Sequence, residues 1–119
     1  MTATREQWLA EMSESLGVDP DDVLEVAAMF FKAIDGRLSG IENAYQAGDM
    51  NELRRLAHGL KGDAANMRFR KSSQLARTLE MQSKDGNVTN FEAQFKALCD
   101  AVQEQKRSLG LDFEAIPAP

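Results

Sequence analysis

Residues 19–45 read DPDDVLEVAAMFFKAIDGRLSGIENAY, and this stretch contains the pattern that decides the fold. Asp19 is suited to cap a helix, and Pro20 follows at the first helical position, where its missing N–H is not needed. Apolar residues then recur at steps of three and four, which places them on one face of a helix. We therefore expect one long amphipathic helix over residues 20–47. Its apolar stripe consists of Val23, Ala27, Phe30, Ile34, Leu38, Ile41 and Tyr45.

The rest of the chain also has helical spacing. A shorter helix is expected over about residues 4–16. Asp49 and Glu52 resemble a capping box that opens another helix near Met50, which we expect to continue to about Lys84. A last helix follows and stops at about residue 109, and the tail 110–119 is expected to be a loose end. No alternating strand pattern occurs in the sequence.

Short connections between long helices make sequential helices antiparallel. We therefore expect an all-α fold, an antiparallel up-down four-helix bundle with an additional short N-terminal helix. Residues 1–119 form a single domain in this interpretation, with the bundle over about residues 20–109. The core stripe of the helix that starts near Met50 would reach Lys71 if extrapolated, which indicates that this helix bends or changes face there.

Composition excludes several classes of protein. The 119 residues, 43% of them hydrophobic, suit one domain with a real core. One cysteine and one histidine allow neither an internal disulfide nor a His/Cys zinc cluster. The chain opens with no signal-peptide pattern and has no apolar run of the roughly 20 residues that a membrane span needs. We expect a soluble cytoplasmic protein with no membrane association and no metal or cofactor of its own.

Positive charge is concentrated in one segment. The net charge of −5 argues against nucleic acid as a partner. Residues 54–77 nevertheless hold 7 of the 14 lysines and arginines and only one acidic residue. Such a segment is either a solvated helix face or a surface that steers an acidic partner.

The basic segment includes the only histidine, in the stretch LAHGLKGDAANM over residues 56–67. Each helical residue advances the azimuth by about 100°, so the apolar positions form a stripe roughly 80° wide. His58 lies about 140° from the centre of that stripe by the same rotation and is expected to be exposed. Lys61 and Gly62 are its neighbours one turn along the helix. The stripe consists of Leu53, Leu56, Ala57, Leu60, Ala64 and Met67.

This placement gives Gly62 a role. Without a side chain, Gly62 leaves the surface beside the imidazole open, and Ala65 is small on the same face. Phe69 lies close to His58 in azimuth and is expected to be an exposed aromatic at an interface. An accessible neutral imidazole is a nucleophile, and the ammonium of Lys61 can pair with a phosphoryl group placed on it. For Gly59 we expect only close packing by a neighbouring helix.

Other interpretations of His58 are possible from the spacing alone. A lone exposed histidine on a helix is most often ordinary surface. Hydrolase chemistry would need a strained nucleophile, an orienting carboxylate and a pocket, which an exposed helix face does not offer. No glycine-rich loop follows a strand, so we expect no ATP site and no kinase activity of the chain itself.

The residues around His58 resemble the signature of histidine-containing phosphotransfer (HPt) domains. The resemblance rests on AHGLKG at residues 57–62, AANM at 64–67 and LE at 79–80. The upstream AGD at residues 47–49 and LRRL at 53–56 are similar to the way such domains enter the helix that bears the histidine. The similarity extends over about residues 20–109.

The resemblance implies a four-helix bundle that takes a phosphoryl group from an aspartyl phosphate of a receiver domain and passes it to another receiver aspartate. His58 would be the phospho-acceptor, Lys61 the lysine that supports the phosphoryl group, and Gly62 the glycine that gives the receiver access. The implied partners are response-regulator receiver domains and a hybrid sensor histidine kinase. Mg²⁺ would belong to the receiver, and the chain would act as a monomer.

The sequence departs from the family pattern at two positions. Asp63 stands where the family usually has a small residue, and Arg68 stands near a usual glycine. We expect these changes to affect the choice of partner more than the chemistry. The alternative function is a helical adaptor that binds a receiver or sensor kinase without being phosphorylated, although an adaptor has no need of His58. The expected partner-binding residues are Arg54, Arg55, Ala65, Asn66, Arg68 and Phe69.

Overall fold

The computed structural model describes residues 4–111, and within them every regular element is a helix. The all-α prediction is therefore confirmed for this part of the chain. The tail expected from residue 110 lies outside the described residues beyond Leu111. The helices are α1 (Arg5–Leu16), α2 (Pro20–Gln46), α3 (Met50–Asn66), α4 (Arg70–Lys84) and α5 (Phe91–Ser108).

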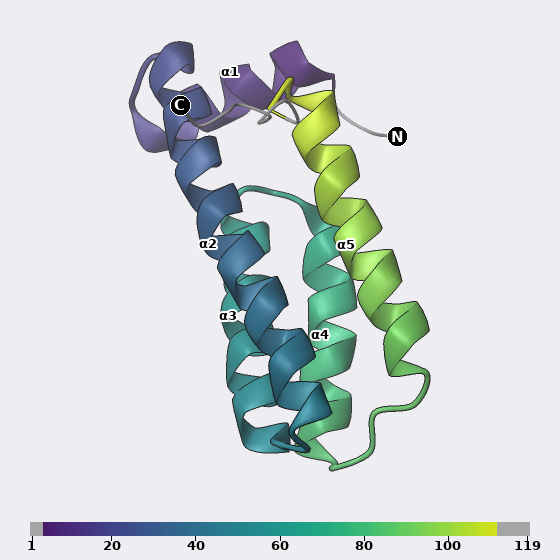
Figure 1. The fold of residues 1–119 in the computed structure, drawn as a ribbon. Helices are drawn as coiled ribbons and strands as arrows, with labels where there is room; N and C mark the ends of the chain where they lie inside the picture. The colour runs from purple at the N-terminus through teal and green to yellow at the C-terminus, as the bar shows by residue number, and fades with distance from the viewer. Residues whose placement is uncertain (1–3, 112–119) are drawn as a thin grey trace, which may run out of the picture.

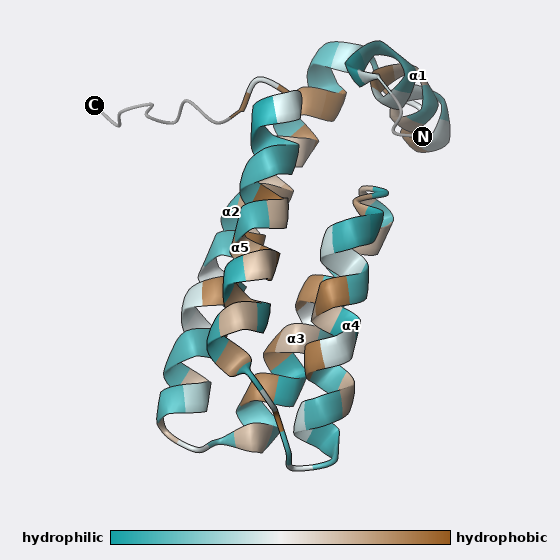
Figure 2. Cartoon of the chain, turned by 90° about the vertical axis from the view of Figure 1, so that its right-hand side faces the viewer, coloured by the Kyte–Doolittle hydropathy of each residue, from teal (hydrophilic) through white to brown (hydrophobic). Residues whose placement is uncertain are grey.

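Four of the helices, α2 to α5, run up and down beside one another, and α1 lies across one end of them (Figure 1). α3 packs most extensively against α4 and then against α2, while α5 contacts α4 and α2. Hydrophobic residues gather where the helices face one another, and hydrophilic residues cover the outside (Figure 2). The predicted four-helix bundle with an additional N-terminal helix is confirmed.

The long helix α2 begins as the sequence predicts, with Asp19 at the cap position and Pro20 next, although the Asp19 side chain makes no capping hydrogen bond. Most of the predicted stripe is buried. Phe30 and Tyr45 are only half-buried, whereas Phe31 and Ala44 lie in the core. α2 therefore presents a slightly different face to the bundle than the spacing suggests.

The expectation of one continuous helix over residues 50–84 is wrong, because the chain turns between Asn66 and Arg70. Arg68, just beyond α3, has a φ of 63°, the left-handed conformation that ends many helices. Its amide donates to the carbonyl of Ala65 at 3.0 Å, and the amide of Phe69 donates to the carbonyl of Ala64 at 2.8 Å. These two bonds form a Schellman motif, which usually has glycine where arginine stands here. The turn separates α3 from α4 and so supplies the fourth helix of the bundle.

α1 packs on this turn. The side chain of Trp8 is buried, and its indole N–H donates to the carbonyl of Met67 at 2.8 Å. The ring of Phe69 stacks on those of Trp8 and Phe31, with centroids 5.9 and 5.2 Å away. The expectation that Phe69 is exposed beside His58 is therefore wrong. Rotation along α3 no longer applies after the turn, and Phe69 is a core residue.

Candidate functional site

α3 presents one face to the core and the opposite face to solvent. Asp49 caps the helix by accepting from the amide of Glu52 at 3.0 Å, as the sequence predicts. His58 lies away from the core with its side chain 67% exposed, which agrees with the predicted rotation. The predicted core stripe is buried throughout, at Leu53, Leu56, Ala57, Leu60, Ala64 and Met67.

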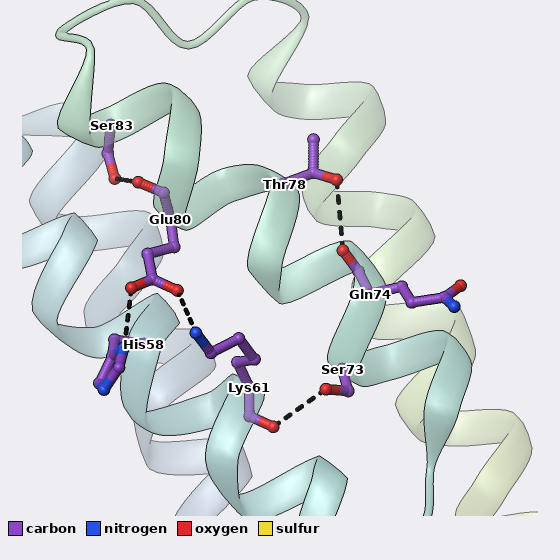
Figure 3. A network of polar contacts seen from close by, with 7 residues as sticks. All are labelled: His58, Lys61, Ser73, Gln74, Thr78, Glu80 and Ser83. Carbon is purple, nitrogen blue, oxygen red and sulfur yellow. Dashed lines mark hydrogen bonds and ion pairs between the residues drawn. The ribbon is translucent and has the colours of Figure 1, made fainter.

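One carboxylate, that of Glu80 on α4, joins His58 and Lys61 (Figure 3). Its Oε2 lies 2.7 Å from Nδ1 of His58, and its Oε1 lies 2.8 Å from Nζ of Lys61. The Glu80 side chain is only 16% exposed, so it reaches the histidine from between the two helices. Glu80 belongs to the sequence motif that resembles HPt domains, but its spacing from His58 predicts no role for it. It meets His58 only because the chain turns between α3 and α4, and no local signal in the sequence predicts that turn.

The carboxylate determines which ring nitrogen of His58 is free. A carboxylate only accepts hydrogen bonds, so Nδ1 of the neutral imidazole carries the hydrogen and donates it to Glu80. Nε2 then keeps its lone pair, on the side of the ring away from Glu80. The contact therefore makes Nε2 the nucleophilic atom of an exposed side chain.

Glu80 is suited to remain ionised in this position. The hydrogen bond from Lys61 is the main cause that lowers the pKa of the Glu80 carboxyl below its ordinary value of 4.5. Partial burial opposes this change in pKa, and the hydrogen bond from His58 reinforces it. Around neutral pH the carboxylate can thus accept from both neighbours at once.

Hydrogen bonds of α4 hold this arrangement in place. The hydroxyl of Ser73 donates to the backbone carbonyl of Lys61 at 3.1 Å and so ties α4 to α3 beside the site (Figure 3). Further along α4, the hydroxyl of Ser83 donates to the backbone carbonyl of Glu80 at 2.9 Å. The position of the carboxylate is therefore fixed by helix packing rather than by a loop.

The surface next to His58 is open at Gly62. A Cβ atom built on Gly62 would meet no heavy atom within 4 Å, so no neighbouring side chain requires a glycine there. Ala65 and Asn66 are exposed further along α3. A second molecule can therefore reach the imidazole over this part of the helix.

Gly59 has a different environment, which explains a residue that the sequence left nearly unexplained. A Cβ atom on Gly59 would collide with the guanidinium of Arg37, which crosses from α2. The Nε atom of that guanidinium lies 3.0 Å from Oδ2 of Asp63. Close packing by a neighbouring helix is confirmed at Gly59, and the unusual Asp63 has a partner in Arg37.

An open hollow of about 400 Å³ borders the imidazole on the N-terminal side of α3. Arg55 at its wall pairs with Glu52 through two hydrogen bonds of 2.8 and 2.7 Å, and Arg54 is exposed. Two of the expected partner-binding arginines therefore lie beside His58. The hollow is lined by Asn51, Arg54, Arg55, His58 and Glu80.

The described residues also bear on metal binding and on thiol chemistry. Between residues 4 and 111, no three His, Cys, Asp or Glu side chains gather as metal ligands would. Burial is the main cause that raises the pKa of the Cys99 thiol, and nearby carboxylates raise it further, which disfavours a thiolate nucleophile.

No helix between residues 4 and 111 combines the length and the apolar character that crossing a bilayer requires.

The comparison with protein families agrees with the geometry. The family model described as Hpt domain matches residues 25–105, which is more than half of the chain. The chain belongs to the Hpt domain family, whose members carry out histidine phosphotransfer in two-component phosphorelays and interact there with receiver domains and kinases. Comparisons with curated proteins and with solved structures gave no match. α1 lies outside the matched residues.

Proposed function

We propose that His58 accepts a phosphoryl group from the aspartyl phosphate of a receiver domain and passes it to the aspartate of another receiver. The observation that carries this proposal is the 2.7 Å contact between Nδ1 of His58 and the Glu80 carboxylate. It orients an exposed imidazole so that Nε2, the atom with the lone pair, faces solvent.

The transfer is a direct exchange of one bond for another. Nε2 attacks the phosphorus, a P–N bond forms, and the P–O bond to the aspartate breaks, so that the aspartate leaves as a carboxylate. The phosphorylated ring is cationic while Nδ1 keeps its hydrogen, and the ionised Glu80 beside it stabilises that charge. No proton has to move, and the reverse step restores the neutral ring when a second receiver takes the phosphoryl group.

Lys61 is the cation that supports the transferred group in this proposal. Its ammonium has three N–H donors, one of which is directed at Glu80 at 2.8 Å. The Lys61 side chain is 30% exposed, so the ammonium can also pair with phosphoryl oxygens on the neighbouring ring. Glu80 holds the lysine within reach of the place where negative charge arrives.

The surroundings of His58 favour a protein as phosphoryl donor. Gly62 leaves room for a second protein to approach, and the arginines of the adjacent hollow favour a partner with acidic residues. A receiver domain supplies the aspartate and the Mg²⁺ that it needs, so this chain contributes the nucleophile and its positioning.

The test is transfer of radioactive phosphoryl from purified phosphorylated receiver domains in the presence of Mg²⁺. We expect acid-labile, alkali-stable label on the wild type and none on H58Q. Equal labelling of H58Q, or no labelling of the wild type by any receiver, would overturn the proposal. Binding of a receiver without labelling would identify a helical adaptor instead.

A further inference from the structure

A second groove lies at the turn between α3 and α4, and we call it the corner groove. It has a volume of about 460 Å³ and is built from three helices and the turn itself. Glu11 comes from α1, which lies outside the residues that match the family. The groove is lined by Glu11, Ala65, Arg68, Arg70, Ser73 and Gln74.

The corner groove continues the open face of His58. Ala65 follows His58 by seven residues, which is two helical turns or a rise of about 10 Å. Gly62 lies between them and has no heavy atom within 4 Å of a built Cβ. Ser73, in the wall of the groove, is the residue that bonds to the Lys61 carbonyl. A protein bound over the imidazole is therefore within reach of the groove.

Arg68 is held in this groove at some cost in backbone energy. Its φ of 63° suits glycine, and other L-residues pay roughly 1 kcal/mol or more for it. Its neighbours Met67 and Phe69 are buried, and Trp8 bonds to the Met67 carbonyl, so contacts on both sides hold the backbone in this conformation. Glycine would suit the backbone of this turn better, so the backbone conformation gives no reason for arginine at this position.

The charges in the groove leave room for an acidic ligand. Arg68 pairs with Glu11 at 2.9 Å, and the two side chains are 45% and 55% exposed. Such exposed pairs contribute little to stability, so another carboxylate can replace Glu11. Arg70 is exposed and makes no ion pair with any residue in the range 4–111. The groove is therefore lined by two arginines and only one glutamate.

We propose that the corner groove is a second docking point for the receiver, where a carboxylate of the receiver displaces Glu11 from Arg68 and also meets Arg70. The inference rests on the proposed function, since it places the same partner on a longer stretch of the α3 face. Glu11 acts as an internal competitor that weakens docking of any receiver without an acidic residue at this place. The groove thereby selects among receivers, while His58 performs the same chemistry with each.

The experiment uses the full chain and a panel of purified receiver domains phosphorylated by phosphoramidate. The receiver that transfers fastest to the wild type is chosen, and KM and kcat of transfer are measured for E11Q, R68Q and R70Q. Each rate is divided by the rate at which the same variant takes phosphoryl directly from phosphoramidate, so that changes at His58 cancel. K96Q, which removes an exposed cation from α5, is the matched control.

We expect R68Q and R70Q each to raise KM by about five-fold, E11Q to lower KM by about two-fold, and kcat to change little. Added salt should raise KM for the wild type and K96Q more than for R68Q. Because glycine suits the backbone of the turn, R68G should fold at least as well as the wild type and still show the raised KM. The KM of K96Q should equal that of the wild type.

Equal KM values for the wild type, R68G and R70Q would overturn the inference while leaving the proposed function intact. It would also be overturned if E11Q raised KM as R68Q does, because the ion pair would then serve only the fold. Absence of label from every receiver would instead remove the proposed function, and the docking point with it. Competition by inorganic phosphate alone, with no effect of E11Q, would identify a simple anion site and exclude a docking point.

Discussion

The two flanks of α3 each receive a charged side chain from a neighbouring helix, but the two contacts have different consequences. On the flank toward α4, a charged side chain from the neighbouring helix, Glu80, reaches across to His58 and Lys61. On the flank toward α2, a charged side chain from the neighbouring helix, Arg37, reaches across to Asp63. The first contact ends on an exposed imidazole, and the second fills the space over a glycine.

The difference shows that glycine has two uses within one helical turn. The guanidinium of Arg37 lies over Gly59 and would have to shift for a larger residue, whereas a Cβ atom on Gly62 would meet no heavy atom within 4 Å. Each costs the helix up to about 1 kcal/mol relative to alanine. Packing inside the chain offsets the cost at Gly59. At Gly62 no such contact offsets the cost, and access for a partner is the role that we propose, which makes the two positions separable by experiment.

The largest effect is expected for G62L. A bulky side chain beside His58 should keep a receiver from the reacting geometry and slow transfer by about 100-fold. The variant should be at least as stable as the wild type, because the position is open and leucine favours the helix. Transfer kinetics from a phosphorylated receiver and thermal unfolding measure the two quantities.

The matched control for this substitution is G36L, since Gly36 is also helical and also has no heavy atom within 4 Å of a built Cβ. It should gain similar stability without loss of transfer. If G36L slows transfer as much as G62L does, the effect is not one of access to His58.

A smaller loss is expected for E80Q. The amide leaves Lys61 without its ion pair and removes the charge that stabilises the phosphorylated ring, so transfer should slow by about ten-fold. Nitrogen NMR of the imidazole should also show a weaker preference for hydrogen on Nδ1. R37Q, on the other flank, should transfer at the wild-type rate. Equal slowing of phosphoryl transfer in E80Q and R37Q would contradict the inference that only the flank toward α4 takes part in transfer.

A double-mutant cycle tests the flank toward α2. In the R37A background, G59A should raise the free energy of unfolding by about 1 kcal/mol, because alanine favours the helix and nothing is displaced. In the wild type the same substitution should gain less, because it pushes the guanidinium away from Asp63. Denaturant unfolding of the four proteins gives the coupling. The corresponding cycle of G62A with R37A should show no coupling. A coupling of similar size in that cycle would contradict a specific contact between Arg37 and Gly59.

The smallest effect is a dependence of stability on pH through Glu80. Its pKa is lowered in the folded chain, so its contribution is fully present above its ordinary value of 4.5 and is lost as pH falls through the lower folded pKa. The difference in free energy of unfolding between the wild type and E80Q should therefore narrow below pH 4.5. Chemical denaturation at several pH values measures it, and a constant difference would contradict the assignment.

The sequence predicts the helices where its signals are local. Spacing and capping residues give α2, the start of α3 and the exposure of His58, because each depends on residues within a few turns. The end of α3 escapes prediction because neither glycine nor proline marks the turn. Only the approach of the apolar stripe to Lys71 indicates a change there. The predicted exposure of Phe69 is wrong for the same reason, because the helical rotation of α3 does not apply beyond Asn66, where α3 ends.

The charged contacts of the site could not be predicted from spacing. Glu80 and Arg37 reach α3 from helices on either side, and which residues meet depends on how the helices are rotated and shifted against one another. The resemblance to a family includes Glu80 in its motif without stating what it touches. Lys61 and Gly62 lie one turn from His58 on α3, as the spacing predicts, whereas the position of Arg54 and Arg55 in the hollow beside His58 is known only from the structure.

The buried position of Trp8 also gives the protein an intrinsic fluorescent probe. It is the only tryptophan in the sequence, its indole N–H bonds to the Met67 carbonyl, and its ring stacks on Phe69. The tryptophan emission of the whole molecule therefore comes from the corner between α1 and the turn after α3. Fluorescence can follow events at that corner in the unlabelled protein, separately from the chemistry at His58.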